Sequence, residues 1–188
     1  MFDGLSLALL AGLTVLAFLT FQHYGVSFDE EVQDNYGKAI VEWYRTLGRD
    51  RAAVEYLDLY YYGGLFDTLA ALFNQVSPFG HWESRHLLNA LVGIVGLAGC
   101  WRFGRHLGGA AAGFLALALL ALMPSYYGMM FINPKDVPFA VGMVWSAYFL
   151  TRIAERLPEA PRDELIKLTI AAGLTMGIRV GGFLVLFF

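Results

Sequence analysis

Five stretches of this chain are each long and apolar enough to cross a lipid bilayer, and this feature limits the fold more than any other. A membrane-spanning helix needs about 20 mostly apolar residues. Hydrophobic residues make up 57% of the chain and charged residues only 15%, which is more apolar than the balance of a soluble domain. The sequence therefore predicts an all-α, polytopic helix bundle with spans at about 5–22, 86–103, 109–129, 137–153 and 168–188.

The two ends of the chain carry separate expectations. The first span lacks the basic n-region and small-residue cleavage site of a signal peptide, which indicates a retained signal anchor. The last span runs to Phe188 without polar residues that would leave the bilayer. We therefore expect residues 1–188 to be one transmembrane domain from the amino-terminal part of a longer protein.

Basic residues on short loops predict the orientation, because such loops remain on the cytoplasmic side. They gather between the second and third spans and again between the fourth and fifth, as Arg102, Arg105, His106, Arg152, Arg156, Arg162 and Lys167. Those two loops should be cytoplasmic. The long loop 23–85 and the short loop 131–136 should then both face the outer compartment.

The loop over residues 23–85 holds ten of the sixteen acidic residues of the chain. Within it, apolar residues recur at helical spacing over 28–47 and again over 59–76, a pattern that predicts two amphipathic helices. Their many aromatic side chains are typical of the membrane interface. We expect both helices to lie along the outer surface of the membrane.

An acidic cluster opens the first of these helices. Asp29 and Glu30 follow Ser27 shortly after the first span, where neighbouring carboxylates could serve as a catalytic base. A structural role is also open, because Ser27 and Glu30 have the spacing of a capping box and acids favour a helix N-terminus.

An acid and a base lie together in the short outer loop, where Lys135 and Asp136 precede the fourth span. Asp136 could cap that helix, since Pro138 follows it closely. Arg179 is the strongly charged residue deep in the last predicted span. A charge at such depth is costly and tends to mark a substrate pathway or an internal ion pair, although Arg179 could also extend to the outer interface.

Other polar and aromatic residues favour structural interpretations. His81 and His86 are five residues apart, a spacing that does not place two metal ligands on one helix face. Tyr60, Tyr61 and Tyr62 fit an interfacial aromatic cluster better than a site. By contrast, the predicted orientation brings the acidic cluster, the Lys135–Asp136 pair and Arg179 to one level of one membrane face, although they come from independent segments.

These features together resemble the GT-C membrane glycosyltransferases, in particular the branch of dolichyl-phosphate-mannose protein mannosyltransferases and aminoarabinose transferases. The resemblance rests on the outward first loop that begins Phe28-Asp29-Glu30, its two juxtamembrane helices, and Asn133-Pro134-Lys135-Asp136 after the third span. The resemblance extends over the whole chain, which corresponds to the amino-terminal part of such an enzyme. It implies a multi-pass protein of the plasma or inner membrane that has its active site on the outer face.

The resemblance also implies roles for the charged residues. The family transfers a sugar from a polyprenyl-phosphate carrier to a lipid, glycan or protein acceptor. Asp29, with Glu30 beside it, corresponds to the acid of the first loop and Asp136 to the acid of the second. Lys135 and Arg179 would bind the donor phosphate. A divalent metal, Mg²⁺ or Mn²⁺, bridged by Asp29 and Asp136 occurs in some relatives.

Two other functions stay open from the sequence. A transporter or lipid carrier would also be a polytopic bundle, and a non-catalytic assembly subunit would fit a chain with only five spans. The net charge of −3 provides no basic surface for nucleic acid, which excludes that class of partner.

Overall fold

The computed structural model describes residues 1–187 of the chain, and within them it contains helices and turns but no β-strand. The all-α prediction is therefore confirmed. The elements are α1 (Phe2–Thr20), η1 (Phe21–His23), α2 (Phe28–Arg45), α3 (Ala52–Glu55), η2 (Leu59–Tyr61), α4 (Leu65–Val76), α5 (His81–Ala121), α6 (Pro124–Ile132), α7 (Asp136–Ala154), α8 (Arg162–Ile178) and η3 (Val180–Phe187).

Three helices in this part of the chain, α1, α5 and α7, are long and apolar enough to cross a membrane. In α1 only 17% of the apolar window is buried within the protein, and side chains such as Leu7, Phe18 and Leu19 are exposed. Water would disfavour such a surface, whereas hydrocarbon lipid accommodates it. The protein is an integral membrane protein with a helical bundle.

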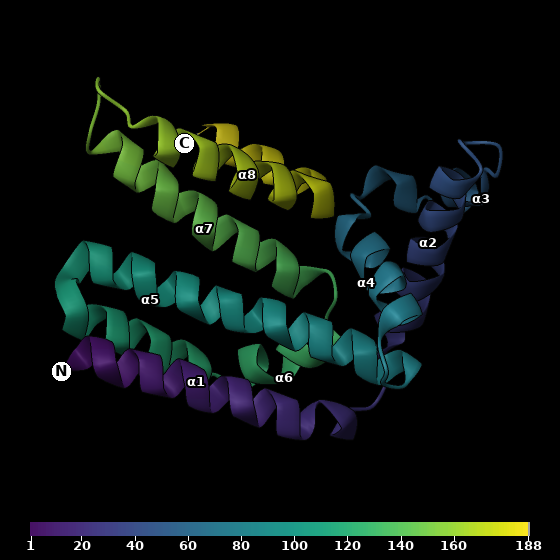
Figure 1. Cartoon of the computed structure of the whole chain (residues 1–188). Coiled ribbons are helices and arrows are strands. Elements are labelled where there is room, and N and C mark those ends of the chain that lie inside the picture. Colours follow the sequence, from purple (N-terminus) through teal and green to yellow (C-terminus); the bar gives the residue numbers. More distant parts are fainter. Residues whose placement is uncertain (188) are drawn as a thin grey trace.

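α5 folds back on itself at Gly109, so that its 41 residues form two arms (Figure 1). Gly109 has φ +79°, a conformation that glycine adopts without steric cost. A side chain at Gly113 would meet the Trp101 carbonyl, because the arms approach closely there. The arms correspond to the predicted second and third spans. The third was expected to reach 129, but its helix ends at Ala121 and α6 begins at Pro124, since proline cannot donate a backbone hydrogen bond.

The fifth span, predicted over 168–188, does not coincide with a single helix in the described residues, and its last residue, Phe188, lies outside them. α8 begins at Arg162 and ends at Ile178. Arg179 then has extended backbone angles, and η3 follows. Glycines 177, 181 and 182 lower the helix propensity of this region. The Gly177 backbone also lies directly against Gly63, leaving no room for a side chain at Gly63.

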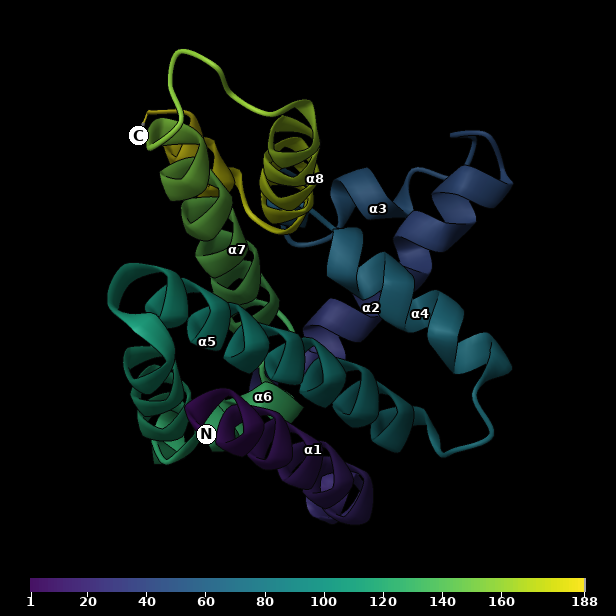
Figure 2. The same cartoon turned by 60° about the vertical axis from the view of Figure 1, so that its left-hand side comes forward.

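The two amphipathic helices predicted within residues 23–85 are present as α2 and α4, and they lie across one end of the bundle (Figures 1 and 2). α4 starts at Leu65 rather than at residue 59, because Gly63 and Gly64 separate it from the short η2 turn. α2 and α4 pack closely where Gly37 faces the Asp67 backbone. Their position along a membrane surface stays a prediction.

α7 begins at this same end of the bundle and lies between α5 and α8 (Figure 1). The core beneath it includes Met130 and Phe131 of α6, which pack against Leu87 of α5. Phe66 of α4 packs against Ile178 at the end of α8. The start of α7, the end of α8 and the first-loop helices are therefore held together at one end of the molecule.

Candidate functional site

Four charged side chains from three separate segments meet at this end of the bundle. Asp29 lies in the first turn of α2, Lys135 and Asp136 open α7, and Arg179 follows α8. Lys135 Nζ lies 4.0 Å from Asp29 Oδ2, and the Arg179 guanidinium forms an ion pair with the Asp136 carboxylate. The sequence could only assign these two acids and two cations to one membrane face. In the structure they form two acid–cation pairs.

A turn built by Asn133 sets the position of the second pair. Asn133 Oδ1 accepts hydrogen bonds from the backbone N–H of Lys135 at 3.3 Å and of Asp136 at 2.8 Å. Its Nδ2 atom donates to Asp136 Oδ2 at 3.1 Å. Asn133 therefore satisfies the free N–H groups at the start of α7. Asp136 is not needed as a cap, and its carboxylate remains available to Arg179.

Tyr62 joins the two cations. Its ring centroid lies 5.5 Å from Lys135 Nζ and 5.8 Å from Arg179 Cζ, within the range of cation–π attraction. The ring centroid of Phe139, a residue of α7, lies 5.9 Å from Arg179 Cζ. The sequence interpretation, which grouped Tyr62 with an interfacial aromatic cluster, missed this contact. Nothing in the spacing of three consecutive tyrosines indicates which one faces the site.

Asp29 and Glu30 are adjacent in sequence but face different surroundings. The Asp29 side chain is 57% exposed, whereas Glu30 is only 1% exposed. Glu30 accepts a hydrogen bond from the Ser27 N–H at 2.7 Å and lies 3.0 Å from His86 Nε2. Ser27 and Glu30 form the expected capping box of α2. Glu30 therefore points into the protein behind the site.

The Ser27 hydroxyl links the segment before α2 to the segment before α7. It donates a hydrogen bond of 2.8 Å to the Ile132 carbonyl at the end of α6. That carbonyl immediately precedes Asn133. The residue that begins α2 is thus bonded to the segment that begins the Lys135–Asp136 turn.

A buried ionic network behind the site was not predicted from the sequence. Arg85 is 2% exposed and lies between two carboxylates, 3.2 Å from Asp34 and 3.6 Å from Asp67. Asp34 also contacts Lys38 at 2.6 Å and His81 at 3.0 Å. The network joins α2, α4 and the start of α5. The i,i+4 spacings of Asp34 with Lys38 and of His81 with Arg85 were the available signal, but they do not show which helices meet.

Comparison with known families decides the class of protein. Residues 65–188, more than half of the chain, match the family model described as dolichyl-phosphate-mannose-protein mannosyltransferase. The chain belongs to this family. The resemblance expected from the sequence is therefore confirmed, and the protein is a membrane glycosyltransferase of the GT-C type. No curated protein and no solved structure matches the chain.

The family match covers part of the candidate site. The match begins at Leu65, so Tyr62 lies just before it. Lys135, Asp136 and Arg179 lie inside the matched range. Asp29 lies before it, so its assignment to this mannosyltransferase-family site rests on its contact with Lys135.

In the part of the chain that the structure describes, Asp29 and Asp136 each face a cation and do not share a metal position. Among the residues described by the structure, no three His, Cys, Asp or Glu side chains converge to hold an ion. Asp29 faces Lys135 and Asp136 faces Arg179, so each carboxylate is directed at a fixed cation. This arrangement does not fit a divalent metal bridged by Asp29 and Asp136.

The buried network predicts that the free energy of unfolding of this mannosyltransferase-family protein depends on pH. Burial raises the pKa of Asp67 to about 7, although Arg85 opposes the shift. Between about pH 4 and pH 7, Asp67 is thus protonated in the folded protein and ionised in the unfolded chain. The free energy of unfolding should fall as pH rises through this window, by up to about 1.4 kcal/mol per pH unit.

Asp67→Asn should remove this component, because the amide does not titrate. We expect the variant to gain stability relative to the parent as pH rises from 5 to 8, measured as Tm in detergent. The exposed Asp58→Asn is the control and should follow the parental curve. Parallel pH profiles for the parent and Asp67→Asn would show that Asp67 is ionised throughout.

Proposed function

We propose that this protein transfers a sugar from a polyprenyl-phosphate carrier to an acceptor hydroxyl on the outer face of the plasma or inner membrane. The observation that carries the proposal is the pairing of Asp29 with Lys135 beside the pair of Asp136 with Arg179. It supplies an exposed carboxylate next to two fixed positive charges. Transfer from a lipid phosphate requires that combination, a base for the acceptor and cations for the leaving group.

In the proposed reaction, the Asp29 carboxylate takes the proton of the acceptor hydroxyl. The acceptor oxygen bonds to the anomeric carbon of the sugar while the bond from that carbon to the phosphate oxygen breaks. The bonding electrons leave with the lipid phosphate, whose added negative charge Lys135 and Arg179 stabilise. Attack from the side opposite the leaving group inverts the anomeric configuration.

The remaining site residues have positioning roles in this proposal. Asp136 directs the Arg179 guanidinium through their ion pair, and Tyr62 lies under both cations. Glu30 holds the first turn of α2 through Ser27 and His86. Glu30 and Asp136 therefore keep Asp29 and Arg179 in place, and neither needs to exchange a proton with the substrates.

The donor class is tested by a transfer assay. The purified protein in liposomes should transfer radiolabelled sugar from a polyprenyl-phosphate donor to acceptor lipid, glycan or peptide, and should not use the corresponding nucleotide sugar. Transfer from the nucleotide sugar alone would contradict the lipid-phosphate donor. Protein-dependent movement of intact donor across the bilayer, without transfer, would instead support a lipid carrier.

The outer-face location is tested by labelling. Asp29→Cys and Asp136→Cys should react with a membrane-impermeant thiol reagent added outside intact cells, in a Cys100→Ala background. Arg102→Cys and Arg156→Cys should react only after the membrane is permeabilised. The reverse pattern would place the candidate site on the cytoplasmic side and would contradict transfer at the outer face.

A further inference from the structure

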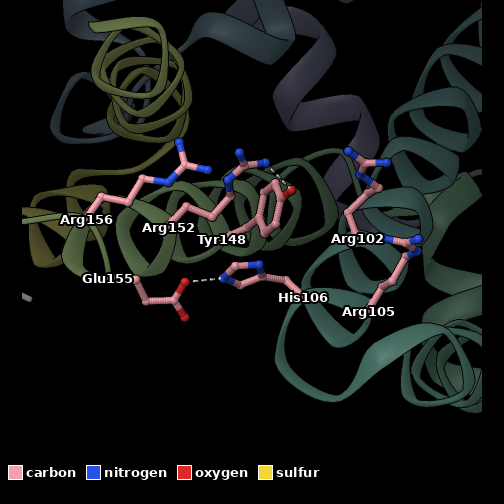
Figure 3. A pocket seen from close by; sticks show the side chains of 7 residues that line it. All are labelled: Arg102, Arg105, His106, Tyr148, Arg152, Glu155 and Arg156. Carbon is pink, nitrogen blue, oxygen red and sulfur yellow. Dashed lines mark hydrogen bonds and ion pairs between the residues drawn. The ribbon is translucent and has the colours of Figure 1, made fainter. Parts of the chain in front are cut away.

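A basic pocket lies at the opposite end of the bundle from the candidate site. It has a volume of about 230 Å³, and its lining consists of Arg102, Arg105, His106, Tyr148, Arg152, Glu155 and Arg156 (Figure 3). The residues come from the first arm of α5 and from the end of α7 and the residues just after it. α7 has 19 residues, so its two ends are about 28 Å apart at the rise of an α-helix.

Acids pair with two of the four arginines at this pocket and leave the other two without a partner among the described residues. Asp3 of α1 accepts two hydrogen bonds from Arg105, at 2.7 and 2.9 Å. Glu164 of α8 pairs with Arg152 at 2.6 Å. Glu155 lies 2.9 Å from His106 Nε2. Within residues 1–187, Arg102 and Arg156 have no acidic partner, so two guanidinium groups lie at the pocket without a counter-charge.

Orientation alone does not explain this arrangement. Basic loops on the cytoplasmic side account for the presence of arginines, but not for their convergence from two segments on one cavity. The Tyr148 hydroxyl is already an acceptor for Arg152 at 2.8 Å, which fixes one guanidinium at the pocket wall. Like charges gathered in this way repel each other unless an anion lies between them.

We propose that this pocket binds the phosphate group of an anionic membrane lipid. Guanidinium groups form bidentate hydrogen bonds with phosphate oxygens, and basic pockets between transmembrane helices at the cytoplasmic side suit lipid head groups. A lipid is favoured over a soluble anion because the pocket lies at the end of α7, one of the helices apolar enough to span the membrane. The site is separate from the sugar-transfer site and does not depend on the proposed reaction.

The proposal is tested by thermal unfolding of the purified protein in dodecyl maltoside micelles. Added phosphatidylglycerol should raise the Tm by about 2–8 °C, whereas phosphatidylcholine should not. Arg102→Gln and Arg156→Gln should each lose most of the rise. Both side chains are exposed and unpaired with acids, so both variants should melt near the parental Tm without added lipid.

Arg162→Gln is the matched control, because Arg162 is an exposed arginine at the start of α8 that does not line the pocket. It should keep the full response. An equal response to both lipids, or an equal loss in Arg162→Gln, would overturn the proposal. A rise with inorganic phosphate at constant ionic strength, but not with phosphatidylglycerol, would retain a phosphate site and overturn its assignment to a lipid.

Discussion

Asp29→Asn should lower the rate of sugar transfer by about 10²–10⁴-fold while the protein stays folded. The change is isosteric, and it removes the negative charge together with the ability of the side chain to accept a proton. Asp29 is exposed, and among residues 1–187 it pairs with Lys135 at 4.0 Å. Capping of α2 does not depend on it, because Ser27 and Glu30 form the capping box. The transfer assay with a polyprenyl-phosphate donor, beside a thermal melt of both proteins, measures the two effects separately.

Glu31→Gln provides the control for this substitution. Glu31 is exposed, lies in the same first turn of α2 and carries the same charge. Each substitution removes one favourable interaction with the helix dipole, worth about 0.3–1 kcal/mol, so the two Tm values should be similar. Only Asp29→Asn should lose activity. If Asp29→Asn transferred sugar at nearly the parental rate, Asp29 would not be the base, and Asp136 and Glu30 would be tested next.

Arg179→Leu should lower kcat by about 10²–10³-fold, the usual cost of removing one group that stabilises developing negative charge. Arg179 forms an ion pair with Asp136 and lies against the Tyr62 ring, which holds its charge where a lipid phosphate would enter between α7 and α8. Arg179→Lys should keep part of the activity, because a positive charge remains although the planar fork is lost. Kinetics at varied donor concentration separate kcat from KM.

Arg49→Leu is the control for Arg179, because Arg49 is an exposed arginine between α2 and α3 and lies outside the candidate site. It should change neither kcat nor KM. Direct binding of the donor lipid gives a second measurement that does not depend on turnover. Equal donor binding and equal kcat for the parent and Arg179→Leu would mean that Arg179 only pairs with Asp136.

The elements with strong periodicity were predicted well from the sequence. The stripe over 28–47 indicated α2, and the apolar run over 5–22 indicated α1, because both patterns reflect the surroundings of a single helix. Helix ends were less predictable. Nothing in the apolar pattern separates α6 from the second arm of α5, or shows that α8 stops at Ile178, since those ends depend on Pro124, on glycines and on the pairing of Arg179.

Contacts between distant segments lay beyond what the sequence could show. Charge and predicted orientation placed Asp29, Lys135, Asp136 and Arg179 on one face, and they are indeed neighbours. The same reasoning predicted a catalytic role for Glu30 as well as for Asp29. However, successive side chains of an α-helix point about 100° apart around its axis. That rotation takes Glu30 into the protein, beside His86, and only the packing of α2 on α5 determines which of the two acids is exposed.

The hydrogen bond from Ser27 to the Ile132 carbonyl has a consequence for the cost of catalysis. It fixes the separation of the two loops before any substrate arrives, so that binding energy is not spent on bringing acid and cations together. A preorganised site of this kind converts substrate binding directly into a lower barrier. Loss of the Ser27 hydroxyl would leave every charged residue in the chain. The two loops would then have to be aligned during each turnover, and the entropy lost in that alignment would raise the barrier.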